Sequence, residues 1–163
     1  MIRKFAFAPV AAADARVLIL GSLPGEASLA EGRYYAHPQN RFWYLVGKAI
    51  TVDLVSLGYD DRLSALQDTG FALWDTVVSA RRIGSLDAAI RDAEHAPLAE
   101  LVATLPHLRA VAFNGRTSSA IGRPQLAHHD LALIDLPSSS PAYASMPLGD
   151  KERLWARLAD FLD

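Results

Sequence analysis

A short, unbroken run of hydrophobic residues that ends in glycine, at residues 16–21, constrains the fold of this chain most strongly. The residues from Val17 to Leu20 are all aliphatic, and Gly21 ends the run. A strand with one face in water alternates polar and apolar residues, whereas a continuous run of this length is typical of a strand buried on both faces. The run therefore predicts a central strand of a parallel sheet that helices cover on both sides.

Three more segments have this character, and segments with helical periodicity separate them. Strands are predicted at residues 71–78, 110–115 and 131–136, and helices at 40–50, 61–67, 97–104, from 117–121 onward, and at 149–162. Strands that alternate with helices at this spacing favour a mainly parallel sheet. We expect a three-layer α/β/α fold, and the length of 163 residues leaves room for one domain, residues 1–163.

Composition excludes several classes of chemistry. The chain has no cysteine, which rules out disulfides, thiolate zinc sites, iron–sulfur clusters and cysteine nucleophiles. His128, His129 and Asp130 are adjacent and therefore point in different directions, so no metal site is predicted, and the Gly-x-Ser-x-Gly pattern of serine hydrolases is absent. We expect no cofactor and no metal.

Charge and hydropathy bear on partners and location. The formal net charge of the chain is −2. If the protein binds DNA, its basic groups must therefore be concentrated on one part of the surface. Arginines near predicted loops permit such a face, although Arg-rich usage is also what a GC-rich genome produces; they are Arg33, Arg41, Arg81, Arg82, Arg116 and Arg123. No long apolar run or secretory signal is present, so we expect a protein of the cytoplasm without membrane contact. We also expect a monomer, associated with the nucleoid if it binds DNA.

The segments that follow the predicted strands are the candidates for a binding site, because ligands bind at the carboxyl ends of parallel strands. The first motif, residues 21–25 (Gly-Ser-Leu-Pro-Gly), is a tight turn that could present backbone N–H groups. Asp75 ends another strand and could accept a hydrogen bond from a ring N–H, or pair with Arg82 for structural reasons. The serine loop, residues 137–141 (Pro-Ser-Ser-Ser-Pro), suits phosphate binding but could also be an ordinary exposed loop.

The aromatic segment, residues 34–43, is the most informative stretch. It holds stacking rings, a histidine, an amide and an arginine at the expected start of a helix. A pocket for a planar base needs an aromatic face and directional hydrogen-bonding groups. A purely structural interpretation stays open, with Phe42 and Trp43 in the core, Asn40 as a helix N-cap and His37 as a loop residue.

Taken in order, these segments resemble the uracil-DNA glycosylase superfamily over nearly the whole chain. Residues 21–25 followed by 35–43 (Tyr-Ala-His-Pro-Gln-Asn-Arg-Phe-Trp) resemble its mismatch-specific and hypoxanthine-acting branches. Residues 70–75 and 82–87 are similar to the hypoxanthine-acting branch in particular. The resemblance implies a DNA glycosylase, and each role below is an expectation that follows from it.

By this likeness, Tyr35 stacks on the flipped base, Asp75 recognises it, and the serine loop grips the DNA backbone. Leu23 and Leu136 stand where many relatives carry polar catalytic residues, and the hypoxanthine-acting branch, which resembles this arrangement, is thought to rely on the residue matching Asn40. The predicted site is Asn40 for catalysis; Gly21, Ser22, Leu23, Pro24, Tyr35 and Asp75 for the base; and Gly25, His37, Arg41, Asn114, Ser138, Ser139 and Ser140 for DNA.

The expected reaction is hydrolysis of the N-glycosidic bond of hypoxanthine, uracil or both in DNA, as in base excision repair. It is expected to be monofunctional, since none of the three lysines, Lys4, Lys48 and Lys151, lies in a predicted post-strand loop where it could form a Schiff base. Two alternatives stay open. The weak net charge favours an N-glycosidase of free nucleosides or nucleotides, and the leucines at 23 and 136 favour a non-catalytic module that binds damaged DNA.

Overall fold

The predicted central strand forms at Val17–Gly21 (β2) and is buried along its whole length. It lies inside a four-stranded parallel sheet with the order β3-β2-β6-β7, in which the other strands are β3 (Phe71–Asp75), β6 (Ala110–Asn114) and β7 (Ala132–Leu136). The structure is a computed structural model and describes residues 2–163. The sheet confirms the predicted parallel core.

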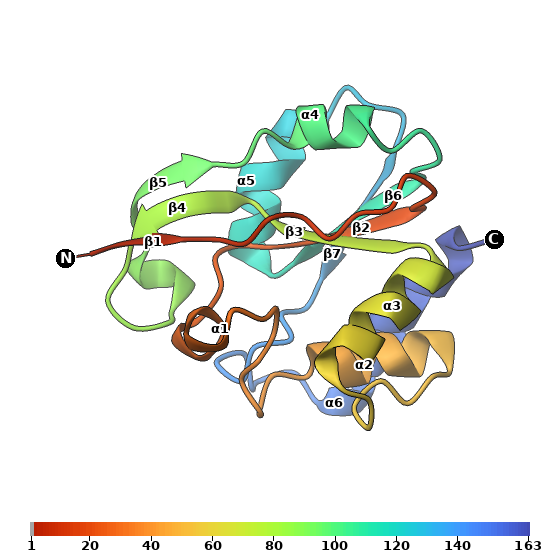
Figure 1. The fold of residues 1–163 in the computed structure, drawn as a ribbon, viewed down its shortest axis with the longest axis horizontal. Helices are drawn as coiled ribbons and strands as arrows, with labels where there is room; N and C mark the ends of the chain where they lie inside the picture. Colours follow the sequence, from red (N-terminus) through yellow and green to blue (C-terminus); the bar gives the residue numbers. More distant parts are fainter. Residues whose placement is uncertain (1) are drawn as a thin grey trace.

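Helices cover both faces of this sheet. Val17 and Ile19 pack into the core formed with α2, α3 and α6, whereas Leu18 and Leu20 pack into the core formed with α4 and α5. Figure 1 shows these two groups of helices below and above the sheet, which confirms the three-layer α/β fold. The helices are α1 (Glu26–Glu31), α2 (Phe42–Ile50), α3 (Tyr59–Thr69), α4 (Leu98–Ala103), α5 (Arg116–Leu126) and α6 (Leu148–Ala156).

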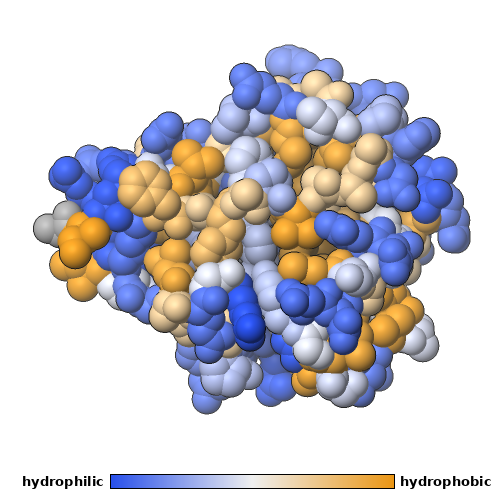
Figure 2. Space-filling model, in the orientation of Figure 1, coloured by the Kyte–Doolittle hydropathy of each residue, from blue (hydrophilic) through white to orange (hydrophobic). Residues whose placement is uncertain are grey.

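The prediction of one strand over residues 71–78 is wrong, because the chain changes sheets at Thr76. The Thr76 N–H and hydroxyl both donate to the carbonyl of Gly21, at 2.8 and 3.1 Å. The chain continues as β4 (Val77–Arg81), which lies in an antiparallel sheet between β1 (Arg3–Phe5) and β5 (Arg91–His95). Figure 2 shows hydrophilic and hydrophobic residues side by side over this small sheet, at the left of the view.

The helix boundaries also differ from the prediction, for example at the start of α2 and at the end of the C-terminal helix. Helix α2 begins at Phe42 rather than at residue 40, since the Asn40 side chain accepts a hydrogen bond from the Phe42 N–H before the helix starts. The C-terminal helix ends at Ala156 and continues as the 3-10 helix η2 (Arg157–Phe161). Within residues 2–163, no helix is both long and apolar enough to cross a membrane.

Candidate active site

A cavity of about 1040 Å³ opens where the parallel strands end. The first motif after β2, Asp75 at the end of β3, Asn114 at the end of β6 and the serine loop after β7 all line it. Every residue that the sequence predicts for the site also lines this cavity, with the exception of Arg41. The structure therefore brings the predicted residues, apart from Arg41, together around one cavity.

Tyr35 provides the aromatic wall. Its ring stacks on Phe42 with centroids 3.8 Å apart and planes 9° from parallel, so one face is already covered by protein. Its φ of 53° lies in the left-handed region, which a tyrosine adopts only when its surroundings hold it there, and the Trp43 indole N–H donates to its carbonyl at 3.2 Å. Burial and the charge of Asp75 raise the pKa of the Tyr35 hydroxyl, which keeps it protonated.

Asp75 carries the unsatisfied polar group of the site. Asp75 is only 4% exposed, and its Oδ2 has no hydrogen-bond partner in the part of the chain that the structure describes. Burial, and then the charge of Asp87, raises the pKa of Asp75 to about 7, although the positive charge of Arg82 lowers it in part. A buried acceptor left without a donor costs about 1–3 kcal/mol, so this oxygen is suited to a ligand that brings a donor.

Gly21 makes the approach of these groups possible. It lies opposite Asp75 in the register of β2 and β3. A Cβ at position 21 would lie 2.6 Å from Asp75 Oδ1 and 3.1 Å from the Tyr35 hydroxyl oxygen. Any larger residue would displace the two side chains that line the cavity at this point, so glycine is required there by space and not by backbone conformation.

Arg82 holds the first motif in place. This side chain is almost fully buried and donates to the carbonyls of Leu23 and Pro24, and to that of Gly84 at 2.9 Å. The alternative that Arg82 is the ion-pair partner of Asp75 is therefore wrong, because its guanidinium is engaged by main-chain carbonyls. Sequence reasoning missed this role, since the partners lie 58 and 59 residues away along the chain.

Asn40 lies one residue before Arg41, the N-cap residue of α2, so the interpretation of Asn40 as the N-cap itself is wrong. Its Oδ1 accepts a hydrogen bond from the Phe42 N–H at 2.9 Å, which fixes the amide at the start of α2. It also lines the cavity, and its NH₂ group and a second Oδ1 lone pair remain for other partners. His37 is exposed beside it, with Nδ1 accepting from the Gln39 N–H at 3.1 Å.

The serine loop is held by Asn114. The Asn114 Oδ1 accepts from the Ser139 N–H and its Nδ2 donates to the Ser139 hydroxyl, both at 2.9 Å, while the Arg41 N–H donates to the Ser139 carbonyl at 3.0 Å. Ser139 and Asn114 are buried, whereas Ser138 and Ser140 are partly exposed. The first pair thus fixes the loop, and the second pair keeps surface exposed at the cavity.

Lys151 also supports the serine loop, a role that the sequence did not suggest. Lys151 as a whole is 5% exposed, and its ammonium donates to the carbonyls of Ser138 and Tyr143, at 2.8 and 2.6 Å. Burial, and then the charge of Arg41, lower the pKa of this amine. Because two carbonyls occupy the ammonium, it acts as a brace for the loop in this geometry.

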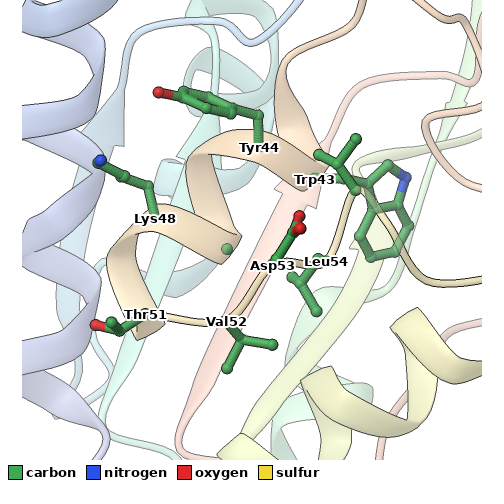
Figure 3. Close-up of a pocket in the computed structure, with 9 residues that line it drawn as sticks. Trp43, Tyr44, Lys48, Thr51, Val52, Asp53 and Leu54 are labelled. Carbon is green, nitrogen blue, oxygen red and sulfur yellow. The ribbon is translucent and has the colours of Figure 1, made fainter.

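A second, smaller hollow of about 420 Å³ lies between α2 and residues 51–55. Figure 3 shows Trp43 and Lys48 on opposite sides of α2 at this hollow. None of the residues that the sequence predicts for the site lines it. Over residues 2–163, the structure contains no group of three or more histidine, aspartate or glutamate side chains arranged to hold a metal ion.

Comparison with known proteins gives a consistent result. The family model of the uracil DNA glycosylase superfamily matches residues 8–161. The chain is 41% identical over 117 residues to a hypoxanthine DNA glycosylase of Methanosarcina barkeri (72% of this chain, 74% of that one) and 37% identical over 139 residues to one of Methanosarcina acetivorans (85% and 87%). The solution NMR structure of a proposed uracil DNA glycosylase from Methanosarcina acetivorans superimposes with a TM-score of 0.88 at 34% identity, covering 99% of each chain. The chain therefore belongs to the uracil-DNA glycosylase superfamily, in the same branch as these hypoxanthine DNA glycosylases.

Proposed function

We propose that this protein is a monofunctional DNA glycosylase that hydrolyses the N-glycosidic bond of deaminated bases, hypoxanthine and uracil among them, in base excision repair. The observation that carries the proposal is the buried, unpartnered Asp75 Oδ2 in a cavity that also presents Tyr35 and Asn40. The names of the two curated relatives support the same activity. The cavity volume of about 1040 Å³ accommodates a nucleotide turned out of the helix.

Asp75 supplies the means of selecting the base. Hypoxanthine and uracil carry a ring N–H beside a carbonyl, whereas adenine and cytosine carry an unprotonated ring nitrogen beside an amino group. An ionised Asp75 only accepts hydrogen bonds, so it can pair with the ring N–H of a deaminated base and repels the lone pair of an unprotonated ring nitrogen. The weaker pairing of deaminated bases also lowers the free energy needed to extrude them.

Asn40 orients the attacking water. Bond cleavage builds positive charge on the sugar and negative charge on the departing base, so fixed dipoles and a positioned water contribute most of the catalysis. The hydrogen bond from the Phe42 N–H holds the Asn40 amide in one orientation and leaves a lone pair of Oδ1 for the water. The Tyr35 ring, fixed against Phe42, packs on the base during this step.

The DNA backbone is held at the rim. Ser138 and Ser140 are the partly exposed hydroxyls of the serine loop, and the exposed Arg116 also lines the cavity. Hydroxyls, backbone N–H groups and arginines are the usual phosphate contacts, and they fix register rather than sequence. A protein with a net charge of −2 that binds in this way should lose DNA affinity steeply as salt rises, whereas an enzyme of free nucleosides should not.

The test is base release from labelled duplexes that each carry one uracil, hypoxanthine or xanthine. Treatment with alkali cuts the strand at abasic sites, so cutting that depends on both protein and alkali demonstrates a monofunctional glycosylase and names its base. Cutting without alkali would contradict the monofunctional reaction. Absence of cutting on every duplex and single strand would contradict the glycosylase activity and leave the nucleoside enzyme or the binding module.

Asn40→Ala tests the assignment of catalysis. We expect this variant to lose base release while its folding and most of its DNA binding remain, because the amide acts on water and not on the phosphates. Gln39→Ala is the matched control, since Gln39 is exposed and does not line the cavity. Retained activity in Asn40→Ala would contradict the assignment and make the neighbouring His37 the next residue to test.

A further inference from the structure

A second carboxyl group reaches the cavity from the segment between β4 and β5. Asp87 is the first residue of the 3-10 helix η1 (Asp87–Ala89) and lines the cavity. Its Oδ1 accepts a hydrogen bond of 2.6 Å from the hydroxyl of Ser22, in the first motif. Asp75 lines the same cavity, and the charge of Asp87 is the second cause of its raised pKa, after burial.

The segment that carries Asp87 is docked on the first motif at several points. The Ser85 hydroxyl accepts from the Glu26 N–H at 2.9 Å, and a Cβ at Gly25 would meet it at 3.4 Å. Arg82 joins the carbonyl of Gly84 to those of the first motif through one buried guanidinium. The position of Asp87 is therefore set before DNA binds, as electrostatic catalysis requires.

The two carboxyl groups have contrasting surroundings. Asp75 is buried at 4% exposure with one oxygen unpartnered, and burial raises its pKa to about 7. Asp87 is only partly buried, and its Oδ1 accepts a hydrogen bond from the hydroxyl of Ser22. Two carboxyl groups in such different environments are suited to two different tasks in one site.

We propose that Asp87 is a further catalytic residue, whose carboxylate stabilises the positive charge on the sugar and receives the proton of the attacking water, with Ser22 as its positioning residue. In this step the bond between C1′ and the base nitrogen breaks and its electron pair leaves with the base. The water oxygen forms the new bond to C1′, one water proton passes to Asp87, and the departing base takes up a proton from solvent. Asp87 then returns its proton to solvent, so no other reactant is needed.

This inference rests on the proposed glycosylase function, and the test uses the full-length protein on its preferred duplex with enzyme in excess over DNA. Asp87→Asn keeps an acceptor for the Ser22 hydroxyl but removes the charge and the basicity. We expect the rate of base release to fall by about 10²–10⁴-fold while DNA affinity is maintained, which is the usual contribution of a positioned acid or base. Asp87→Ala should fall as far, and added formate should restore part of its rate because formate fits the space of the missing carboxylate.

Asp92→Asn is the matched control. Asp92 lies on β5, in the same hairpin as Asp87, but it is exposed, forms an ion pair with Arg81 at 3.5 Å and does not line the cavity. We expect its rate of base release to equal that of the wild type. Ser22→Ala should lower the rate of base release less than either Asp87 variant does, and formate should not change its rate.

Base release by Asp87→Asn at the wild-type rate would overturn the inference, and so would a slow Asp87→Ala that formate does not accelerate. If Asp87→Ala fails to fold, the isosteric Asp87→Asn decides alone. Absence of base release by the wild-type protein on every substrate would instead contradict the proposed function. The experiment thus separates a wrong assignment of Asp87 from a wrong assignment of the enzyme.

Discussion

Replacing Asp75 with asparagine should stabilise the protein at alkaline pH, and by an amount that depends on pH. In the folded protein, burial holds the pKa of Asp75 at about 7, whereas in the unfolded chain the carboxyl has its ordinary value of 3.8. Below pH 3.8 both states are protonated and the group does not affect stability. As pH rises from there to about 7, the unfolded chain ionises first, so the free energy of unfolding falls.

The size of this effect follows from the two pKa values. Each pH unit of separation corresponds to 1.36 kcal/mol, so the carboxyl destabilises the fold above pH 7 by about 4 kcal/mol. Asparagine has no charge and removes this penalty, although its amide brings a cost of about 1–3 kcal/mol if its donors stay unsatisfied. That cost does not vary with pH, so the pH dependence of the difference between variant and wild type isolates the ionisation.

The assay is urea unfolding of both proteins at several values between about pH 4 and pH 8. We expect the Asp75→Asn variant to gain about 4 kcal/mol on the wild type across this range, or roughly 10 °C in Tm for a domain of this size. A difference in stability that stays constant with pH would refute the reasoning. Asp135→Asn is a control that should change stability in the opposite direction. The Ser119 hydroxyl, and then Arg123, lower the pKa of Asp135, so the variant should be less stable than the wild type at neutral pH and equally stable in acid.

Three further outcomes can be checked on the same preparations. Gly21→Ala should abolish base release in the duplex assay, because its Cβ would lie 2.6 Å from Asp75 Oδ1, while circular dichroism should show an intact fold; normal release would refute the close approach. Lys151→Met should weaken DNA binding by about tenfold in fluorescence anisotropy, since the serine loop loses two carbonyl contacts; unchanged affinity would argue against the brace. Arg82→Ala should lower Tm and base release together, as three carbonyls lose a buried donor, and loss of activity without any loss of Tm would contradict its structural role.

The sequence predicts the central sheet well because its strands are buried on both faces. Residues Val17 to Leu20 have no polar member, and β6 is equally continuous, so each run had one interpretation. The change of sheets at Thr76 is hidden, because the residues on both sides of it favour strands and the break depends on a contact with the Gly21 carbonyl. Strand β5 is exposed at every position and lacks the hydrophobic pattern that sequence reasoning uses.

The site follows the same logic. The gathering of residues at the ends of the strands, such as Asp75 and Asn114, could be predicted, because parallel topology brings strand ends to one edge. The sequence does not predict these roles of Arg82, Asp87 and Lys151, because each depends on a contact with the first motif or the serine loop that no local sequence pattern indicates. Their signal in the sequence is only that of polar residues near helix or strand ends, which usually lie on the surface.

The energetics of Asp75 connect the fold of this protein to its chemistry. A domain of this size has a net stability of about 5–15 kcal/mol, so a carboxyl group that removes about 4 kcal/mol above neutral pH is a large burden for a purely structural residue. The structure nevertheless leaves one of its oxygens without a donor and places a second carboxyl, Asp87, within electrostatic reach. A base that donates a ring N–H to Asp75 satisfies the empty acceptor, and a sugar that becomes cationic relieves the repulsion between the two carboxyl groups. In the proposed reaction, the features that destabilise the free protein are thus the ones that favour the transition state of base release.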